Sequence, residues 1–133
     1  MSKRLRIFLP LVVLLLSMAS FDRASAQTGN CDTTGTMNGS ADPPAGVVGD
    51  TIIFRGSGFT PGEAVSFWFT LPNGVVLGTE QPIPGGVNPD GTIGPLPLPI
   101  DESLVNLGTG RWAFTFQGAS SGHQAIIHFC INP

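Results

Sequence analysis

Several short segments of the chain alternate apolar and polar residues with a period of two, which is the pattern of a half-buried β-strand. In the strongest of them, residues 63–71, the side chains of Val65, Phe67 and Phe69 share one face. The pattern predicts strands at 36–41 (the weakest), 51–55, 63–71, 75–77, 92–100, 111–117 and 124–131. After the first 26 residues, no stretch of ten residues has an apolar period of 3.6 free of glycine and proline, so no helix is predicted there.

Glycine and proline separate these segments and set their roles. Asn73-Gly74 is a hairpin signal, because both residues tolerate positive φ at the centre of a tight turn. Pro95, Pro97 and Pro99 lack an N–H donor and confine their segment to the edge of a sheet. Six to seven short strands with frequent turns predict an all-β fold, a two-sheet antiparallel sandwich of the immunoglobulin-like kind.

Strand alternation also predicts an outer face. Because the apolar side chains of residues 63–71 point into the core, Trp68 between them points outward. The third, sixth and seventh strands of an immunoglobulin-like sandwich share a sheet, so outward residues of the last two strands join it. The predicted interaction face consists of Trp68, Arg111, Thr115, Ile126 and His128. Two interpretations stay open: this face binds a partner, or N-terminal residues cover it.

The N-terminus has the three parts of a secretory signal peptide. Basic residues precede an apolar run from Ile7 to Met18, and Ala24-Ser25-Ala26 supplies the small residues that a signal peptidase accepts. Spanning a bilayer takes about 20 apolar residues, so a transmembrane anchor is the weaker interpretation. We expect removal of residues 1–26 and a secreted or periplasmic mature chain.

The remaining 107 residues suffice for one domain. We divide them into an N-terminal leader, residues 27–42, and a sandwich, residues 43–133. Two basic residues, Arg55 and Arg111, stand against eight acidic ones, which is a formal charge of −6. This charge disfavours nucleic acids and anionic membrane surfaces as partners.

The only two cysteines, Cys31 and Cys130, lie near the two ends of the mature chain. An even number of cysteines in an exported protein predicts a disulfide. Free thiols or metal ligands are the alternative, although two cysteines alone do not complete a structural zinc site. The bridge would close almost the whole domain and would pin residues 27–35 of the leader onto the interaction face.

Residues that could carry chemistry form no catalytic or metal-binding pattern. His123, His128 and Cys130 suggest copper, but nothing resembles the Cys-to-His-to-Met loop of a blue-copper site. Asp101 and Glu102 are adjacent acids after the proline-rich strand. Because neighbours on a strand face opposite sides, we do not expect their carboxylates to share a site. We therefore predict a protein that is not an enzyme and has neither metal nor cofactor.

A glycine-rich turn motif precedes the strongest strand. Its members are Gly56, Gly58, Phe59, Pro61 and Gly62. The glycines permit backbone angles forbidden to other residues, the proline presets a turn, and the phenylalanine is placed to close one end of the sandwich. A phosphate-binding loop is the alternative, but such loops need a following helix and usually a lysine.

The turn motif, the Asp90-Gly91 turn and the pattern Gly110-x-Trp112-x-Phe114 resemble bacterial immunoglobulin-like domains of the IPT/TIG kind. The resemblance covers about residues 43–131. It implies a β-sandwich that serves as a spacer, an adhesion unit or a partner-binding unit in surface proteins.

Three functions are compatible with the sequence. The first is a secreted, non-catalytic domain that binds a protein or a component of the cell envelope. The second is a carbohydrate-binding module that uses Trp68 or Trp112. The third and weakest is a hydrolase or metal-dependent enzyme. The sequence predicts neither the partner nor the oligomeric state.

Overall fold

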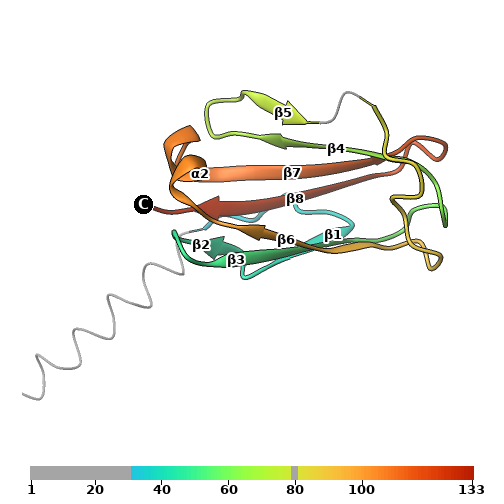
Figure 1. Ribbon diagram of the computed structural model, residues 1–133, viewed down its shortest axis with the longest axis horizontal. Coiled ribbons are helices and arrows are strands. Elements are labelled where there is room, and N and C mark those ends of the chain that lie inside the picture. Colours follow the sequence, from blue (N-terminus) through green and yellow to red (C-terminus); the bar gives the residue numbers. More distant parts are fainter. Residues whose placement is uncertain (1–30, 79–80) are drawn as a thin grey trace, which may run out of the picture. The chain divides into compact units, whose positions relative to one another are not determined.

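A computed structural model describes residues 31–78 and 81–133 of the chain (Figure 1). The predicted signal peptide, residues 1–26, lies outside the described residues. The described residues belong to one compact unit that runs from Cys31 to Pro133.

Two β-sheets build this unit (Figure 1). The three-stranded sheet has the order β1-β3-β6, and the five-stranded sheet has the order β2-β8-β7-β4-β5. The strands are β1 (Gly39–Asp42), β2 (Ala45–Gly46), β3 (Thr51–Gly56), β4 (Val65–Thr70), β5 (Val76–Gly78), β6 (Ile93–Pro99), β7 (Gly110–Gly118) and β8 (Gln124–Ile131). Neighbouring strands pair antiparallel, except that β2 runs parallel to β8. The predicted all-β, immunoglobulin-like sandwich is confirmed.

The core lies between the two sheets and is centred on Phe54 of β3. Its ring meets the rings of Phe114 and Phe129 edge-on, with centroids 4.9 Å apart in each pair. The side chains that alternation assigns to the core of the last two strands are all buried: Trp112, Phe114, Phe116, Ala125, Ile127, Phe129 and Ile131. Burial of these large apolar side chains is the main force that holds the sheets together.

Strand β6 is an edge strand, as its prolines predict. It pairs with β3 on one side, with Ile53 opposite Pro97. Pro95, Pro97 and Pro99 are exposed, whereas Leu96 and Leu98 pack against the core. An edge rich in proline offers few N–H donors, so it resists pairing with another chain.

The short helix α2 (Glu102–Leu107) was not predicted. Asp101 caps its N-terminus, because its carboxylate accepts a hydrogen bond from the Leu104 N–H at 3.1 Å. Strand geometry, by which we separated the Asp101 and Glu102 carboxylates, therefore does not apply, because Glu102 begins a helix. Its six residues are too few to show a helical apolar period, although an aspartate at the N-cap followed by an acidic first turn is a sequence signal for the start of a helix.

The hairpin between β4 and β5 is present, but its turn differs from the prediction. Gly74 takes φ +86°, whereas Asn73 does not take a positive φ. Instead, the Asn73 side chain accepts a hydrogen bond from the Val75 N–H at 3.0 Å. The loop spans residues 71–75 and is longer than a two-residue turn, which explains why one positive φ is enough.

The turn motif closes one end of the sandwich. Phe59 is buried, and its ring meets His123 of the β7–β8 loop edge-on with centroids 4.7 Å apart. Gly58 and Gly62 take φ +87° and +73° as predicted, but Gly56 takes no positive φ. A Cβ at Gly56 would lie 3.1 Å from the Phe116 ring, so close packing rather than backbone angle calls for glycine there.

Part of the predicted leader belongs to the sandwich. Strand β1, from within residues 27–42, pairs with β3 so that Ala41 lies opposite Phe54. Residues 31–37 remain outside both sheets, apart from a single bridge between Met37 and Ile126.

Candidate functional site

The strand register brings the predicted interaction face together. In the five-stranded sheet, Trp68 of β4 lies opposite Thr115 of β7, which lies opposite Ile126 of β8. Two residues further along β8, His128 lies opposite Ala113 of β7. After two more residues, Cys130 lies opposite Arg111. Paired residues point to the same side of a sheet, so all five predicted residues lie on the outer face of the five-stranded sheet.

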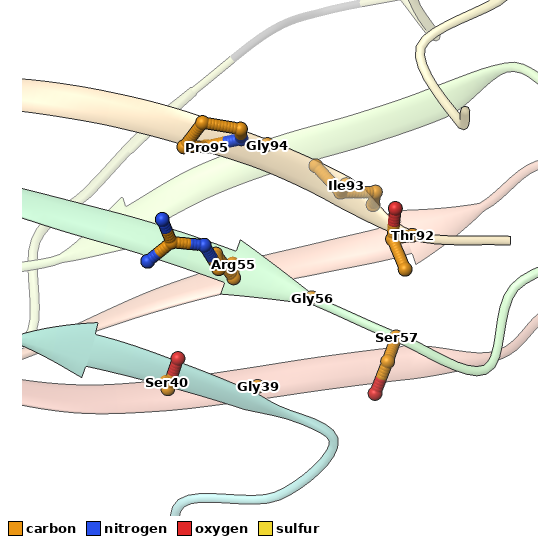
Figure 2. Close-up of a pocket in the computed structure, with 9 residues that line it drawn as sticks. All are labelled: Gly39, Ser40, Arg55, Gly56, Ser57, Thr92, Ile93, Gly94 and Pro95. Carbon is orange, nitrogen blue, oxygen red and sulfur yellow. The ribbon is translucent and has the colours of Figure 1, made fainter. Parts of the chain in front are cut away.

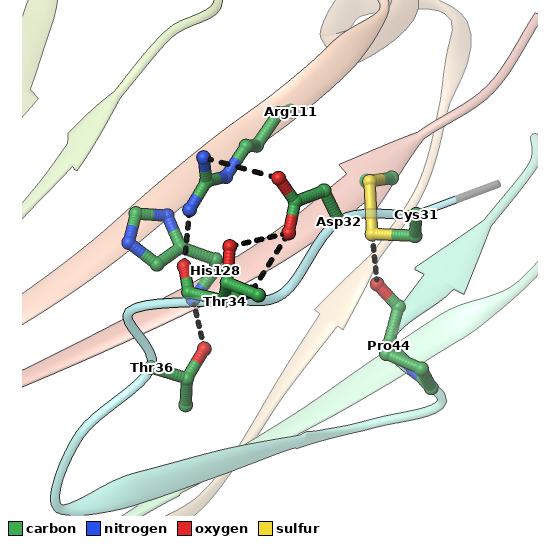
Figure 3. Close-up of a disulfide and its surroundings, with 8 residues drawn as sticks. Cys31, Asp32, Thr34, Thr36, Pro44, Arg111 and His128 are labelled. Carbon is green, nitrogen blue, oxygen red and sulfur yellow. Dashed lines mark hydrogen bonds and ion pairs between the residues drawn. A yellow bond between two sulfur atoms is a disulfide. The ribbon is translucent and has the colours of Figure 1, made fainter.

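The predicted disulfide is present. Cys31 and Cys130 are bridged, with their Cα atoms 5.6 Å apart and a sequence separation of 99 residues (Figure 3). Because Cys130 lies on the outer face, the bridge attaches the N-terminal segment of the described chain to that face.

Polar contacts hold this segment in place (Figure 3). The Arg111 guanidinium donates a hydrogen bond to the carbonyl of Thr34 and lies 3.7 Å from the Asp32 carboxylate. The backbone N–H of His128 donates to the Thr36 hydroxyl at 3.0 Å. We call residues 31–36 the clasp, because they bind the outer face through the disulfide and these contacts.

The clasp shields His128. The Nδ1 atom of its ring is buried and finds no hydrogen-bond partner among the described residues. Burial, followed by the positive charge of Arg111, lowers the pKa of His128. The imidazole is therefore neutral at pH 7. Cys130 is bridged and no longer available as a ligand, and no cluster of three or more metal-ligating side chains occurs in residues 31–78 and 81–133.

The predicted face thus has a covered and an uncovered part. Arg111 and His128 contact the clasp, and Thr115 is only 5% exposed. Trp68 and Ile126 are half-buried. The clasp therefore covers the part of the face around Arg111 of β7 and His128 of β8, and it leaves the part around Trp68 and Ile126 open.

Two residues that the sequence did not predict extend the open part. Val76 of β5 lies opposite Thr70, two residues from Trp68 on the same face, and is 58% exposed. Met37 lies opposite Ile126 and is 48% exposed. We call Met37, Ile126, Trp68 and Val76 the apolar strip. The alternation of apolar and polar residues did not predict Val76, because the side of the sheet on which Val76 lies depends on the register of the β4–β5 hairpin.

Gly78 brings β5 close to Trp68. It is paired with Trp68, and a Cβ at position 78 would lie only 2.4 Å from the Trp68 Cβ. The missing side chain lets β5 approach the tryptophan. Because β5 is the last strand in the order of the five-stranded sheet, the apolar strip ends at the edge of that sheet.

The second tryptophan is not available to a ligand. Trp112 is 2% exposed, and its indole N–H donates to the Gly108 carbonyl at 3.0 Å. The prediction that Trp112 could serve as a carbohydrate platform is wrong, because this side chain faces the core.

Comparison with known proteins points to one family. The family model described as the macroglobulin-like domain matches residues 25–131. Searches of curated proteins and of solved structures find no match. In the described part of the chain, no helix has the length and apolar character needed to cross a membrane.

Proposed function

The chain belongs to the macroglobulin-like domain family, an immunoglobulin-like fold family, and from this premise we propose that it is an exported, non-catalytic domain that binds a protein of the cell envelope. Domains of this fold type are typically non-catalytic binding units. The resemblance of the turn motif to IPT/TIG domains supports the same role.

The apolar strip is the observation that carries the proposal. Large aliphatic side chains that stay half-exposed on one face cost free energy in water, and adjacent ones commonly mark a protein interface. Val76 and Met37 expose about half of their surface at its two ends, and Trp68 lies between them. Tryptophan is among the residues that contribute most to protein–protein binding.

A protein suits this surface better than a sugar does. Aliphatic side chains flank Trp68, and the exposed large hydrophobic residues of the described chain include no aromatic one. Carbohydrate modules rely on exposed aromatic rings, so the carbohydrate alternative lacks the exposed aromatic platform that it needs.

Export is part of the proposal. The Cys31–Cys130 disulfide needs an oxidising compartment, such as the periplasm or the extracellular space. The predicted signal peptide supplies the route. Both features support a secreted or periplasmic location.

Affinity capture tests the proposal. The full chain with a C-terminal tag is exported in its own host, and partners are captured from envelope extract. Three variants are compared with the wild type: Trp68→Ala, Val76→Asp and Val48→Asp. Val48 is 49% exposed in the turn between β2 and β3, so its variant adds the same charge at a similar exposure away from the apolar strip.

We expect the wild type and Val48→Asp to recover the same protein and the two strip variants to lose it at least about tenfold, because truncating a central tryptophan commonly costs about 2 kcal/mol or more. Equal recovery by Val76→Asp, or recovery of polysaccharide alone, contradicts the proposal.

A further inference from the structure

The outer face of the three-stranded sheet carries a hollow of about 510 Å³ around Arg55 (Figure 2). Strands β1, β3 and β6 line it. Three of its residues are glycines, so much of its wall is backbone, and Arg55 is the only charged side chain among the described residues that line it. Figure 2 shows the guanidinium between Ser40 on β1 and Pro95 on β6.

Arg55 is unusual in this acidic molecule. Within residues 31–78 and 81–133, seven acidic side chains stand against two arginines. Arg111 is held by the clasp, whereas Arg55 is exposed and makes no ion pair or side-chain hydrogen bond to the described residues. The five donors of its guanidinium are free for an anion from outside.

A polar neighbour accompanies Arg55. Ser40 is its cross-strand partner, and its exposed hydroxyl has no hydrogen-bond partner among the described residues. The Thr92 hydroxyl on the rim is already engaged, because it donates to Asp90 at 2.5 Å and accepts from Asn88 at 3.1 Å. The Ser57 hydroxyl donates to the Asn38 carbonyl at 3.5 Å. Among the described residues, the side chains that bring free polar groups to the hollow are thus Arg55 and Ser40.

We propose that this hollow binds the carboxylate of an acidic sugar, a uronic acid unit. A guanidinium matches a carboxylate with two parallel hydrogen bonds. The surrounding negative charge repels a dianion such as phosphate more strongly than a monoanion. The volume lies in the range of small-ligand sites, larger than a bare carboxylate fills. The free Ser40 hydroxyl matches a hydroxylated ligand.

Asp42 limits the affinity. It is exposed on the same face of β1, two residues from Ser40 and opposite Ile53. Its negative charge opposes a carboxylate in the hollow, so removing it strengthens binding. The site can therefore be tested with a variant of Arg55 that weakens binding and a variant of Asp42 that strengthens it.

An NMR titration of the tagged, exported protein tests the site. Sodium glucuronate is added at constant ionic strength, with neutral glucose and inorganic phosphate as separate probes, and a polyuronate as a fourth. We expect glucuronate to shift the Arg55 side-chain Nε–H and the amides of Ser40, Gly56 and Gly94. Tighter binding of the polyuronate than of glucuronate identifies a polymer as the source of the ligand.

Arg55→Gln should weaken glucuronate binding about tenfold or more, because a hydrogen-bonded charge is lost. Arg55→Lys keeps the charge but loses the paired donors of the guanidinium, so its affinity for glucuronate should lie between those of the wild type and Arg55→Gln. Asp42→Asn should tighten binding about two- to threefold. Unchanged affinity in Arg55→Gln, tighter phosphate binding, or equal shifts from glucose overturn the proposal. The site lies on the other sheet from the apolar strip, so Val76→Asp leaves it intact.

Discussion

At the scale of single residues, Glu63 holds the two loops at one end of the sandwich together. Glu63 is 7% exposed, and its carboxylate accepts hydrogen bonds from the backbone N–H groups of Thr60, Ser120 and Ser121 at 2.7–3.0 Å. The hydroxyls of Ser120 and Ser121 donate as well. Hydrogen bonding, first from the Ser121 N–H, lowers the pKa of Glu63 to about 2 although burial opposes this.

The lowered pKa makes Glu63 a source of acid sensitivity. Its ordinary pKa is 4.5 and its folded pKa about 2, so the folded state binds fewer protons between these values. The stabilisation is complete above about pH 4.5 and is lost as the pH falls toward 2. We expect Glu63→Gln to lower the free energy of unfolding at pH 7, and the gap to the wild type to close toward pH 2.

Urea unfolding at pH 7, 4.5, 3 and 2 measures this gap. Glu102→Gln is the control, since it removes the same charge at an exposed position at the start of α2. A constant gap between the wild type and Glu63→Gln over this range would show that the carboxylate charge does not carry the contact.

Gly58 tests the packing of the turn motif. Alanine there must adopt φ +87°, and its Cβ would lie 2.8 Å from the His123 Nε2 atom. Gly49 takes φ +99°, and a Cβ at that position would have nothing within 4 Å, so Gly49→Ala reports the backbone cost alone. We expect Gly49→Ala to cost about 1–2 kcal/mol and Gly58→Ala about 1 kcal/mol more. Equal losses in thermal unfolding would show that His123 moves aside freely.

At the scale of elements, the clasp depends on the disulfide. The chain-entropy model assigns the bridge a stabilisation that grows with loop length, and removing a native disulfide from a small exported domain costs about 2–5 kcal/mol. The separation of 99 residues places this bridge toward the upper end. We expect the Cys31→Ser/Cys130→Ser double variant to lose free energy of unfolding by that amount, measured by urea unfolding.

Reductant provides the control for this comparison. It should destabilise the wild type to the level of the double variant and leave the double variant unchanged. Equal stability of the wild type with and without reductant would show that export is not a condition of the fold.

Elements with strong local signals could be predicted from the sequence. Alternation located the long strands and their buried faces, and the prolines placed β6 at an edge. Elements defined by tertiary pairing could not be predicted. Strand β2 has two residues and exists through its pairing with β8, and α2 is shorter than two turns. The contacts of the clasp also depend on where the disulfide places it.

The candidate site shows the same division. Alternation brought Trp68, Thr115 and Ile126 to one face, which the register reproduces. It did not predict that Arg111 would be bound by the clasp or that Val76 would lie beside Trp68. Both outcomes follow from long-range pairing, which leaves no periodic signal in the local sequence.

At the scale of the whole molecule, the two sheets present different chemistry. The five-stranded sheet carries the apolar strip beside a covalently attached clasp, and the three-stranded sheet carries the hollow around Arg55. One small acidic domain thus offers an apolar surface suited to a protein and a cationic hollow suited to a carboxylate. Of the two surfaces, the apolar strip is the one that we propose meets a protein partner.

Site-specific photo-crosslinking in the host tests this role of the apolar strip most directly. A photoreactive amino acid replaces Val76 in one protein and Val48 in another, and both are exported and irradiated in living cells. We expect a crosslink to one protein from position 76 and none to that protein from position 48. The absence of a protein crosslink at position 76, or the same crosslink at both positions, would contradict the proposed interface.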